Sequence, residues 1–149
     1  MSYWDTSALV KLFAVESDSE VFRRHVAETR SPLVTAEFAR LELWTALRRK
    51  EADSQIGGGE ARVLLEEFDM GCVQKEWTLL PDSADVRAEF ERIVEQCFSQ
   101  STPVRIRTLD ALHIAAAHVA GETEIVAADN LLRKAATLLG FQLFPTLTP

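Results

Sequence analysis

Short apolar segments alternate with longer helical segments along the whole chain. Five segments have the length and the aromatic or β-branched content of strands, namely residues 1–4, 31–35, 73–80, 125–128 and 141–144. The segments between them carry apolar residues at helical spacing, over residues 7–15, 20–28, 36–52, 60–70, 84–99, 109–120 and 130–139. This alternation predicts an α/β fold in which a mostly parallel central sheet is covered by helices on both faces.

The composition allows one ordinary hydrophobic core. The chain has 149 residues, of which 47% are hydrophobic, with only six glycines and five prolines. We therefore expect a single domain over residues 1–149. No apolar run approaches the roughly 20 residues of a membrane helix, and the first residues lack the basic region and cleavage site of a signal peptide. This predicts a cytoplasmic protein with no membrane segment, in which Cys72 and Cys97 are reduced core residues.

The charge and the glycine pattern argue against two kinds of binding site. A net charge of −7 argues against a protein that is held to nucleic acid by bulk positive charge, although it leaves room for a small, metal-assisted nucleic-acid site. The glycines at 57–59 are followed by Glu60, Ala61 and Arg62, where a P-loop needs Gly-Lys-Ser/Thr. They are better explained as a turn between two helices.

Two aspartates stand where a predicted strand passes into a predicted helix. Asp5 follows residues 1–4, and Asp129 follows residues 125–128. In open α/β sheets, ligands bind at the carboxyl edge of the strands, where helix N-termini also point. A simple N-cap role explains each aspartate equally well when it is taken alone. Because they can share this edge, we consider them together as one candidate site.

Glu42 lies among apolar positions of the helix predicted over residues 36–52. The helical spacing places four other residues on its face: Phe38, Leu41, Thr45 and Ala46. A glutamate there is wholly or partly desolvated, and an unpaired buried carboxylate is costly unless it is neutralised or holds a cation. Glu37 has a simpler explanation, because an acidic side chain in a first turn favours the helix dipole.

Asp110 lies in the first turn of an almost wholly apolar helix, for which Thr108 is the predicted N-cap. Interaction with the helix dipole explains this aspartate as well as a functional role does. However, Asp5, Asp110 and Asp129 all occupy positions that can share one edge of the sheet. A helix over residues 36–52 that packs on the sheet can bring Glu42 to the same place.

Four carboxylates held together cannot all stay ionised unaided, because like charges raise one another's pKa. A divalent cation removes the conflict. Oxygen ligands with no histidine or cysteine in register favour Mg²⁺ or Mn²⁺ over zinc. The usual chemistry of such a cluster is phosphoryl chemistry, in which the metal activates a water and stabilises the leaving oxygen.

Four segments resemble the motifs of PIN-domain proteins, in particular the VapC-type toxins of type II toxin–antitoxin modules. They are residues 3–12 around Asp5, residues 35–43 with Glu42 in the acidic position, residues 107–115 around Asp110, and residues 126–132 around Asp129. The segments occur in the order of the family's motifs. The resemblance therefore covers nearly the whole chain.

The resemblance implies a three-layer α/β/α PIN-like domain that acts as a metal-dependent endoribonuclease. By position, it implies that Asp5, Glu42, Asp110 and Asp129 are the catalytic acids that bind Mg²⁺ or Mn²⁺, and that Thr6 supports the site through its hydroxyl and backbone. It also implies an RNA substrate, a homodimer and a cognate VapB-like antitoxin. An acidic cleft suits a basic antitoxin segment that places an arginine or lysine there.

Other polar residues near these motifs have weaker signals. Arg105 and Arg107, just before Asp110, are placed to contact RNA phosphates, and Lys11 can flank the same cleft. His113 lies one turn after Asp110, but a histidine on an otherwise apolar helix is more often a satisfied core or rim residue than a base.

Two other functions stay open on the sequence alone. A haloacid-dehalogenase-like phosphatase also begins with a strand followed by an aspartate, but its chemistry needs a second aspartate two residues on, where this chain has Ser7. A non-catalytic PIN-like binding module, which keeps the fold without cleaving RNA, is the alternative outside the enzymes.

Overall fold

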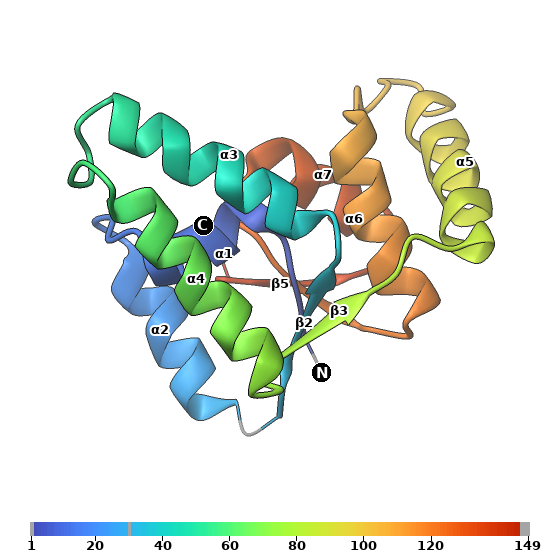
Figure 1. Cartoon of the computed structure of the whole chain (residues 1–149). Helices are drawn as coiled ribbons and strands as arrows, with labels where there is room; N and C mark the ends of the chain where they lie inside the picture. The colour runs from blue at the N-terminus through green and yellow to red at the C-terminus, as the bar shows by residue number, and fades with distance from the viewer. Residues whose placement is uncertain (1, 30, 147–149) are drawn as a thin grey trace.

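The computed structural model describes residues 2–29 and 31–146, and its strands form one sheet (Figure 1). The strands are β1 (Ser2–Trp4), β2 (Leu33–Ala36), β3 (Trp77–Leu80), β4 (Glu124–Val126) and β5 (Gln142–Phe144). Their order is β3-β2-β1-β4-β5, and every described pairing is parallel. The prediction of a mostly parallel sheet is therefore confirmed.

Helices cover both faces of the sheet (Figure 1). Helices α1 (Thr6–Phe13), α2 (Ser19–Glu28), α3 (Ala39–Ala52) and α4 (Glu60–Val73) pack on one face. Helices α5 (Ala84–Phe98), α6 (Thr108–Val119) and α7 (Asn130–Leu138) cover the other. This is the predicted three-layer α/β/α arrangement. Among the described residues, no helix combines the length and the apolar character needed to cross a membrane.

The sheet divides the core of the domain into two hydrophobic clusters, because successive side chains point to opposite faces of a sheet. Tyr3 and Ile125 are buried against the α5–α7 side, whereas their neighbours Trp4 and Val126 are buried against the α1–α4 side. All four side chains are fully inaccessible. Burial on both faces explains why these strands are continuous apolar runs in the sequence rather than alternating ones.

The direction of the strand order changes at β1. The chain passes from β1 to β2 and β3 on one side, and later adds β4 and β5 on the other. The carboxyl ends of β1 and β4 therefore meet at a topological switch point, where open α/β sheets bind ligands. Trp4 is in register with Val126, and the backbone N–H of Asp5 donates to the Val126 carbonyl at 3.0 Å.

Most predicted elements are confirmed, with displaced ends. The predicted strand over residues 73–80 is wrong in its first half, because α4 continues to Val73 and only Trp77–Leu80 pair with β2. The predicted helix over residues 36–52 begins at Ala39, since Ala36 still belongs to β2. Thr108 is the first residue of α6 rather than its cap, which is Arg107. Residue 1 of the predicted first strand lies outside the described residues. Both cysteines are free, as predicted, but only Cys97 is buried in the core, whereas Cys72 is partly buried at its edge.

Gly71 allows α4 to approach β3 closely. A Cβ atom at this position would lie 2.9 Å from Cδ1 of Trp77, which is shorter than carbon atoms normally approach. Trp77 is buried against the rings of Trp4 and Phe68, so it has little freedom to move away. We therefore expect Gly71→Ala to reduce the free energy of unfolding by about 1–3 kcal/mol, although alanine favours a helix more than glycine does.

Urea unfolding followed by circular dichroism measures this difference. Gly58→Ala is the matched control, because a Cβ atom there meets nothing within 4 Å. Its expected change is within about 0.5 kcal/mol. An unchanged or raised free energy of unfolding for Gly71→Ala would show that the Trp77 ring can move away from the added methyl group.

Candidate functional site

Asp5 and Asp129 cap the two helices that start at the switch point. Asp5 Oδ2 accepts a hydrogen bond from the Ser7 backbone N–H at 3.0 Å. Asp129 Oδ1 accepts from the backbone N–H groups of Leu131 and Leu132, both at 3.0 Å. The N-cap interpretation is thus confirmed for both aspartates. Since each cap uses one carboxylate oxygen, the second oxygen of each aspartate is left for another partner.

Ser7 joins the two caps. Its hydroxyl donates to Asp5 Oδ2 and accepts from the backbone N–H groups of Ala128 and Asp129, at 2.9 and 3.0 Å. One side chain therefore fixes the loop after β1 to the loop after β4. This role of Ser7 was not predicted, although a hydroxyl two residues after the strand-end aspartate was an available signal. The phosphatase alternative loses support, because the Ser7 side chain holds two loops where that chemistry needs an acid.

Glu42 reaches the switch point from α3. The face of α3 that packs into the core is formed by three fully buried residues, Ala39, Leu43 and Leu47. Glu42 lies beside this face with 25% of its side chain exposed, which confirms the expected partial desolvation. The predicted face was wrong in part, because Leu41 is 65% exposed and Thr45 is exposed as well. The buried stripe runs along the positions that follow Ala39 at intervals of four.

His113 contacts Glu42 from the buried side. Its Nε2 atom lies 2.5 Å from Glu42 Oε1 and 3.4 Å from Asp5 Oδ1, and its Nδ1 atom lies 2.7 Å from the Tyr3 hydroxyl. The hydroxyl of Thr6 donates to the same Glu42 oxygen at 2.9 Å. The interpretation of His113 as a satisfied core residue is confirmed. No local pattern indicated that its ring would link two of the four acids.

These contacts determine the charges of His113 and Glu42. Burial alone lowers the pKa of His113, but Asp5, Glu42 and Asp110 raise that pKa above its ordinary value. Burial raises the pKa of Glu42, whereas the hydrogen bond and charge of His113 bring that pKa below its usual range. Glu42 is therefore ionised at neutral pH.

Arg107 binds the other two acids. Its Nε donates to Asp110 Oδ2 at 2.7 Å, and its Nη2 donates to Asp129 Oδ2 at 2.8 Å. Burial raises the pKa of Asp110, which the charge of Arg107 opposes and the charges of Asp129 and Asp5 reinforce. The guanidinium therefore supplies the positive charge that lets Asp110 and Asp129 lie close together.

All four predicted acids line one open pocket of about 440 Å³. Thr6 and Arg107 also line it, and Leu41, Arg49 and Leu109 form part of its wall. The pocket lies where β1, β4, α3 and α6 meet, at the switch point of the sheet. Residues from both ends and the middle of the chain are thus brought together as the sequence predicted.

Known proteins share both the sequence pattern and the fold. The family model of the PIN domain matches residues 2–138. The chain belongs to the PIN domain family. It is of the VapC type, since it is 31% identical over 140 residues to Ribonuclease VapC46 of Mycobacterium tuberculosis, covering 93% of this chain and 92% of that protein. It is 28% identical over 144 residues to Ribonuclease VapC35 of the same species, with the same coverage.

A solved structure has the same architecture as this PIN domain. The crystal structure of Mycobacterium tuberculosis VapC20, described as a sarcin-ricin loop cleaving toxin, matches it with a TM-score of 0.67 and 19% sequence identity. The match covers 91% of this chain and 95% of VapC20. At this identity, the comparison shows the shared fold.

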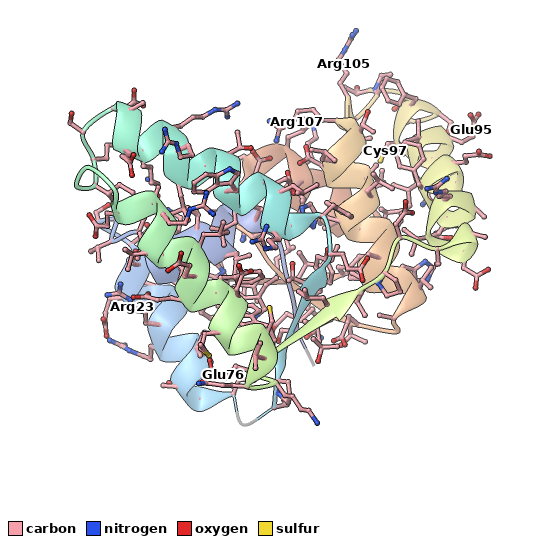
Figure 2. The ribbon with its side chains drawn as sticks, viewed as in Figure 1. Arg23, Glu76, Glu95, Cys97, Arg105 and Arg107 are labelled. Carbon is pink, nitrogen blue, oxygen red and sulfur yellow. The ribbon has the colours of Figure 1, made fainter. Side chains whose placement is uncertain are left out.

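The cations predicted to contact RNA do not all reach the pocket of this PIN domain. Lys11 is buried, and its ammonium lies 2.5 Å from Glu16 Oε2 and 2.7 Å from Asp18 Oδ1, so it does not flank the acids as predicted. Arg105 is exposed and extends away from the start of α6 (Figure 2). Of the three predicted cations, Arg107 alone lines the pocket.

The chemistry of the pocket fits a hard divalent cation. Four carboxylates provide the oxygen ligands that Mg²⁺ and Mn²⁺ prefer. As the side chains stand, however, no three acidic, histidine or cysteine side chains among residues 2–29 and 31–146 are arranged to hold an ion. The acids are instead bound by donors of the PIN domain itself, namely Ser7, His113 and Arg107. A metal ion that binds through the same oxygen atoms as these donors therefore requires the corresponding internal contact to open.

Proposed function

We propose that this PIN domain is a metal-dependent endoribonuclease, the toxin of a VapBC-like toxin–antitoxin module that acts in the cytoplasm. The observation that carries the proposal is the meeting of Asp5, Glu42, Asp110 and Asp129 in one pocket at the switch point. The names of the curated relatives support ribonuclease activity. The description of VapC20 as a toxin that cleaves the sarcin-ricin loop supports RNA as the substrate class.

In this proposal the four acids would hold Mg²⁺ or Mn²⁺, and the bound ion would supply charge stabilisation for the phosphodiester and activation of a water molecule for its hydrolysis. The residues around the acids prepare them for this role. Ser7 fixes the loops that carry Asp5 and Asp129, and His113 keeps Glu42 ionised. Arg107 gives the pocket a guanidinium group, which suits the geometry of a phosphate.

The purified protein is expected to cleave single-stranded RNA in Mg²⁺ or Mn²⁺ and to lose this activity in EDTA. Without the divalent ion, the acids repel the phosphate and the attacking water is not activated. Gel analysis of end-labelled RNA measures cleavage, with a DNA strand of the same sequence as the control substrate. Cleavage that is indifferent to EDTA would contradict metal dependence. Intact RNA, together with no Mn²⁺ binding at millimolar concentration, would favour the non-catalytic module.

The partners that we propose follow from the charge of the pocket and from the family. A basic VapB-like antitoxin segment is complementary to a chain of net charge −7 with four acids in one pocket. We also propose a homodimer, as the resemblance implies. Co-expression with the product of the neighbouring reading frame tests the first point, and size-exclusion chromatography with light scattering tests the second.

A further inference from the structure

Arg107 donates hydrogen bonds to carboxylate oxygens that no other described side chain of the site contacts. Asp129 commits Oδ1 to the cap of α7, and Arg107 takes its Oδ2. The same guanidinium takes Oδ2 of Asp110. One planar cation thus neutralises two carboxylates that come from different helix starts, which is the electrostatic task that a divalent ion performs in an acid cluster.

The guanidinium and a metal ion cannot share these oxygens. Arg107 lies 2.7 and 2.8 Å from them, whereas Mg²⁺ binds its ligands at about 2.0–2.1 Å and demands nearly octahedral geometry. An ion that binds Asp110 and Asp129 through these atoms must displace the guanidinium. We infer that Arg107 is an internal cation that competes with the divalent metal for Asp110 and Asp129, and that its release by the metal frees it to pair with an RNA phosphate. This inference rests on the proposed function.

Arg107 is the internal donor that can leave at the lowest cost. His113 is completely buried, and the Ser7 hydroxyl makes three hydrogen bonds between two loops. In contrast, 60% of the Arg107 side chain is exposed, and its backbone is held independently by buried Ile106 and by the start of α6. Its pair with Asp129 is exposed and its pair with Asp110 is partly buried. An ion pair with an exposed partner changes an equilibrium constant by only about a few-fold, so a metal ion can break it.

Competition of this kind couples the affinity for the metal to the affinity for the RNA substrate. Before metal binds, the guanidinium is paired with two carboxylates, which largely neutralise its charge, so it attracts a phosphate only weakly. After displacement it lies at the edge of the same pocket with its donors free. Metal therefore raises the affinity for RNA, and by linkage RNA raises the affinity for metal.

Calorimetric titration with Mn²⁺ alone tests the competition. Arg107→Gln removes the guanidinium, and we expect the Mn²⁺ dissociation constant to fall roughly three- to tenfold below that of the parent protein. The same variant is expected to raise KM for RNA, because the phosphate loses its partner. Arg105→Gln is the matched control. This variant removes the same charge at a position two residues before Arg107, where the side chain is exposed and extends outward (Figure 2). Its Mn²⁺ dissociation constant is therefore expected to equal that of the parent protein.

Thermal unfolding supplies a second readout that does not depend on activity. Without metal, Arg107→Gln leaves Asp110 and Asp129 facing each other unneutralised, so its Tm is expected to fall below that of the parent. Saturating Mn²⁺ is expected to restore it, which gives the variant the larger metal-induced shift in Tm.

The outcomes separate this inference from the proposed function. If the parent binds Mn²⁺ and Arg107→Gln binds it equally well or more weakly, the competition is refuted and the nuclease proposal stands. If neither protein binds Mn²⁺ at millimolar concentration, both ideas fail. Tighter Mn²⁺ binding by Arg105→Gln as well would show a general effect of charge rather than competition for two carboxylates.

Discussion

Asp110→Asn is expected to lower kcat/KM for RNA by more than about 100-fold. Asp110 is 8% exposed, pairs with Arg107 and lines the same pocket as the other three acids, so the loss of its charge weakens metal binding there. An amide keeps the shape but not the charge. Loss of an outer partner of a metal ligand typically costs about 10- to 100-fold, and loss of a ligand should exceed this. Initial rates with a fluorescent RNA in saturating Mg²⁺ provide the measurement.

Asp5→Asn tests the loss of a second acid while the N-cap of α1 is kept. Asparagine caps a helix as well as aspartate does, so the bond from the Ser7 N–H is kept while the charge is removed. We expect a loss of activity of the same order with little change in Tm. Asp85→Asn changes an acid in the first turn of α5, outside the pocket, and should retain the parental rate. An Asp5→Asn protein that cleaves RNA at the parental rate would refute the role of this cluster.

The sequence predicts the positions of the site's acids because local patterns determine those positions. Asp5 and Asp129 follow strands and precede helices, and both features are visible within ten residues of each aspartate. Glu42 is visible as a charge beside apolar positions. The precise face of α3 was not predictable, because Leu41 and Leu43 fit a helical pattern equally well. Packing against α1 and the sheet then decides that Leu43 is buried and Leu41 exposed.

The links between the acids depend on the order of the strands, which local patterns do not encode. Ser7 and Asp129 are 122 positions apart in the sequence and meet because β4 pairs with β1. Glu42 and His113 are 71 positions apart and meet because α3 and α6 pack on opposite faces at the same edge of the sheet. The first half of the predicted strand at residues 73–80 failed for a different reason: residues 73–76 contain one apolar residue, Val73, and a single apolar residue fits a helix end as well as a strand.

His113→Asn is expected to lower kcat/KM by about 10- to 100-fold, which is typical for the loss of a group that positions a metal-binding side chain. The Nδ1 atom of the ring contacts the Tyr3 hydroxyl, and Nε2 contacts Glu42 most closely, with the Thr6 hydroxyl at 3.3 Å and Asp5 Oδ1 at 3.4 Å. The short amide of asparagine reaches the position of Nδ1, whereas the longer glutamine reaches towards that of Nε2. His113→Asn thus loses the contact with Glu42, and His113→Gln keeps a donor for it.

The comparison of these two variants separates positioning from packing. Both replace a buried ring with a smaller polar group, so both are expected to lose stability to a similar degree. If His113 acts by orienting Glu42, the glutamine variant retains more activity and a Mn²⁺ dissociation constant closer to that of the parent. Tyr3→Phe removes only the partner on Nδ1, and we expect it to reduce activity less than His113→Asn does. Equal losses of activity and of Mn²⁺ affinity in the asparagine and glutamine variants, with parental values for Tyr3→Phe, would instead mean that the ring acts through packing, because the asparagine variant keeps the contact of Nδ1 and the glutamine variant keeps that of Nε2.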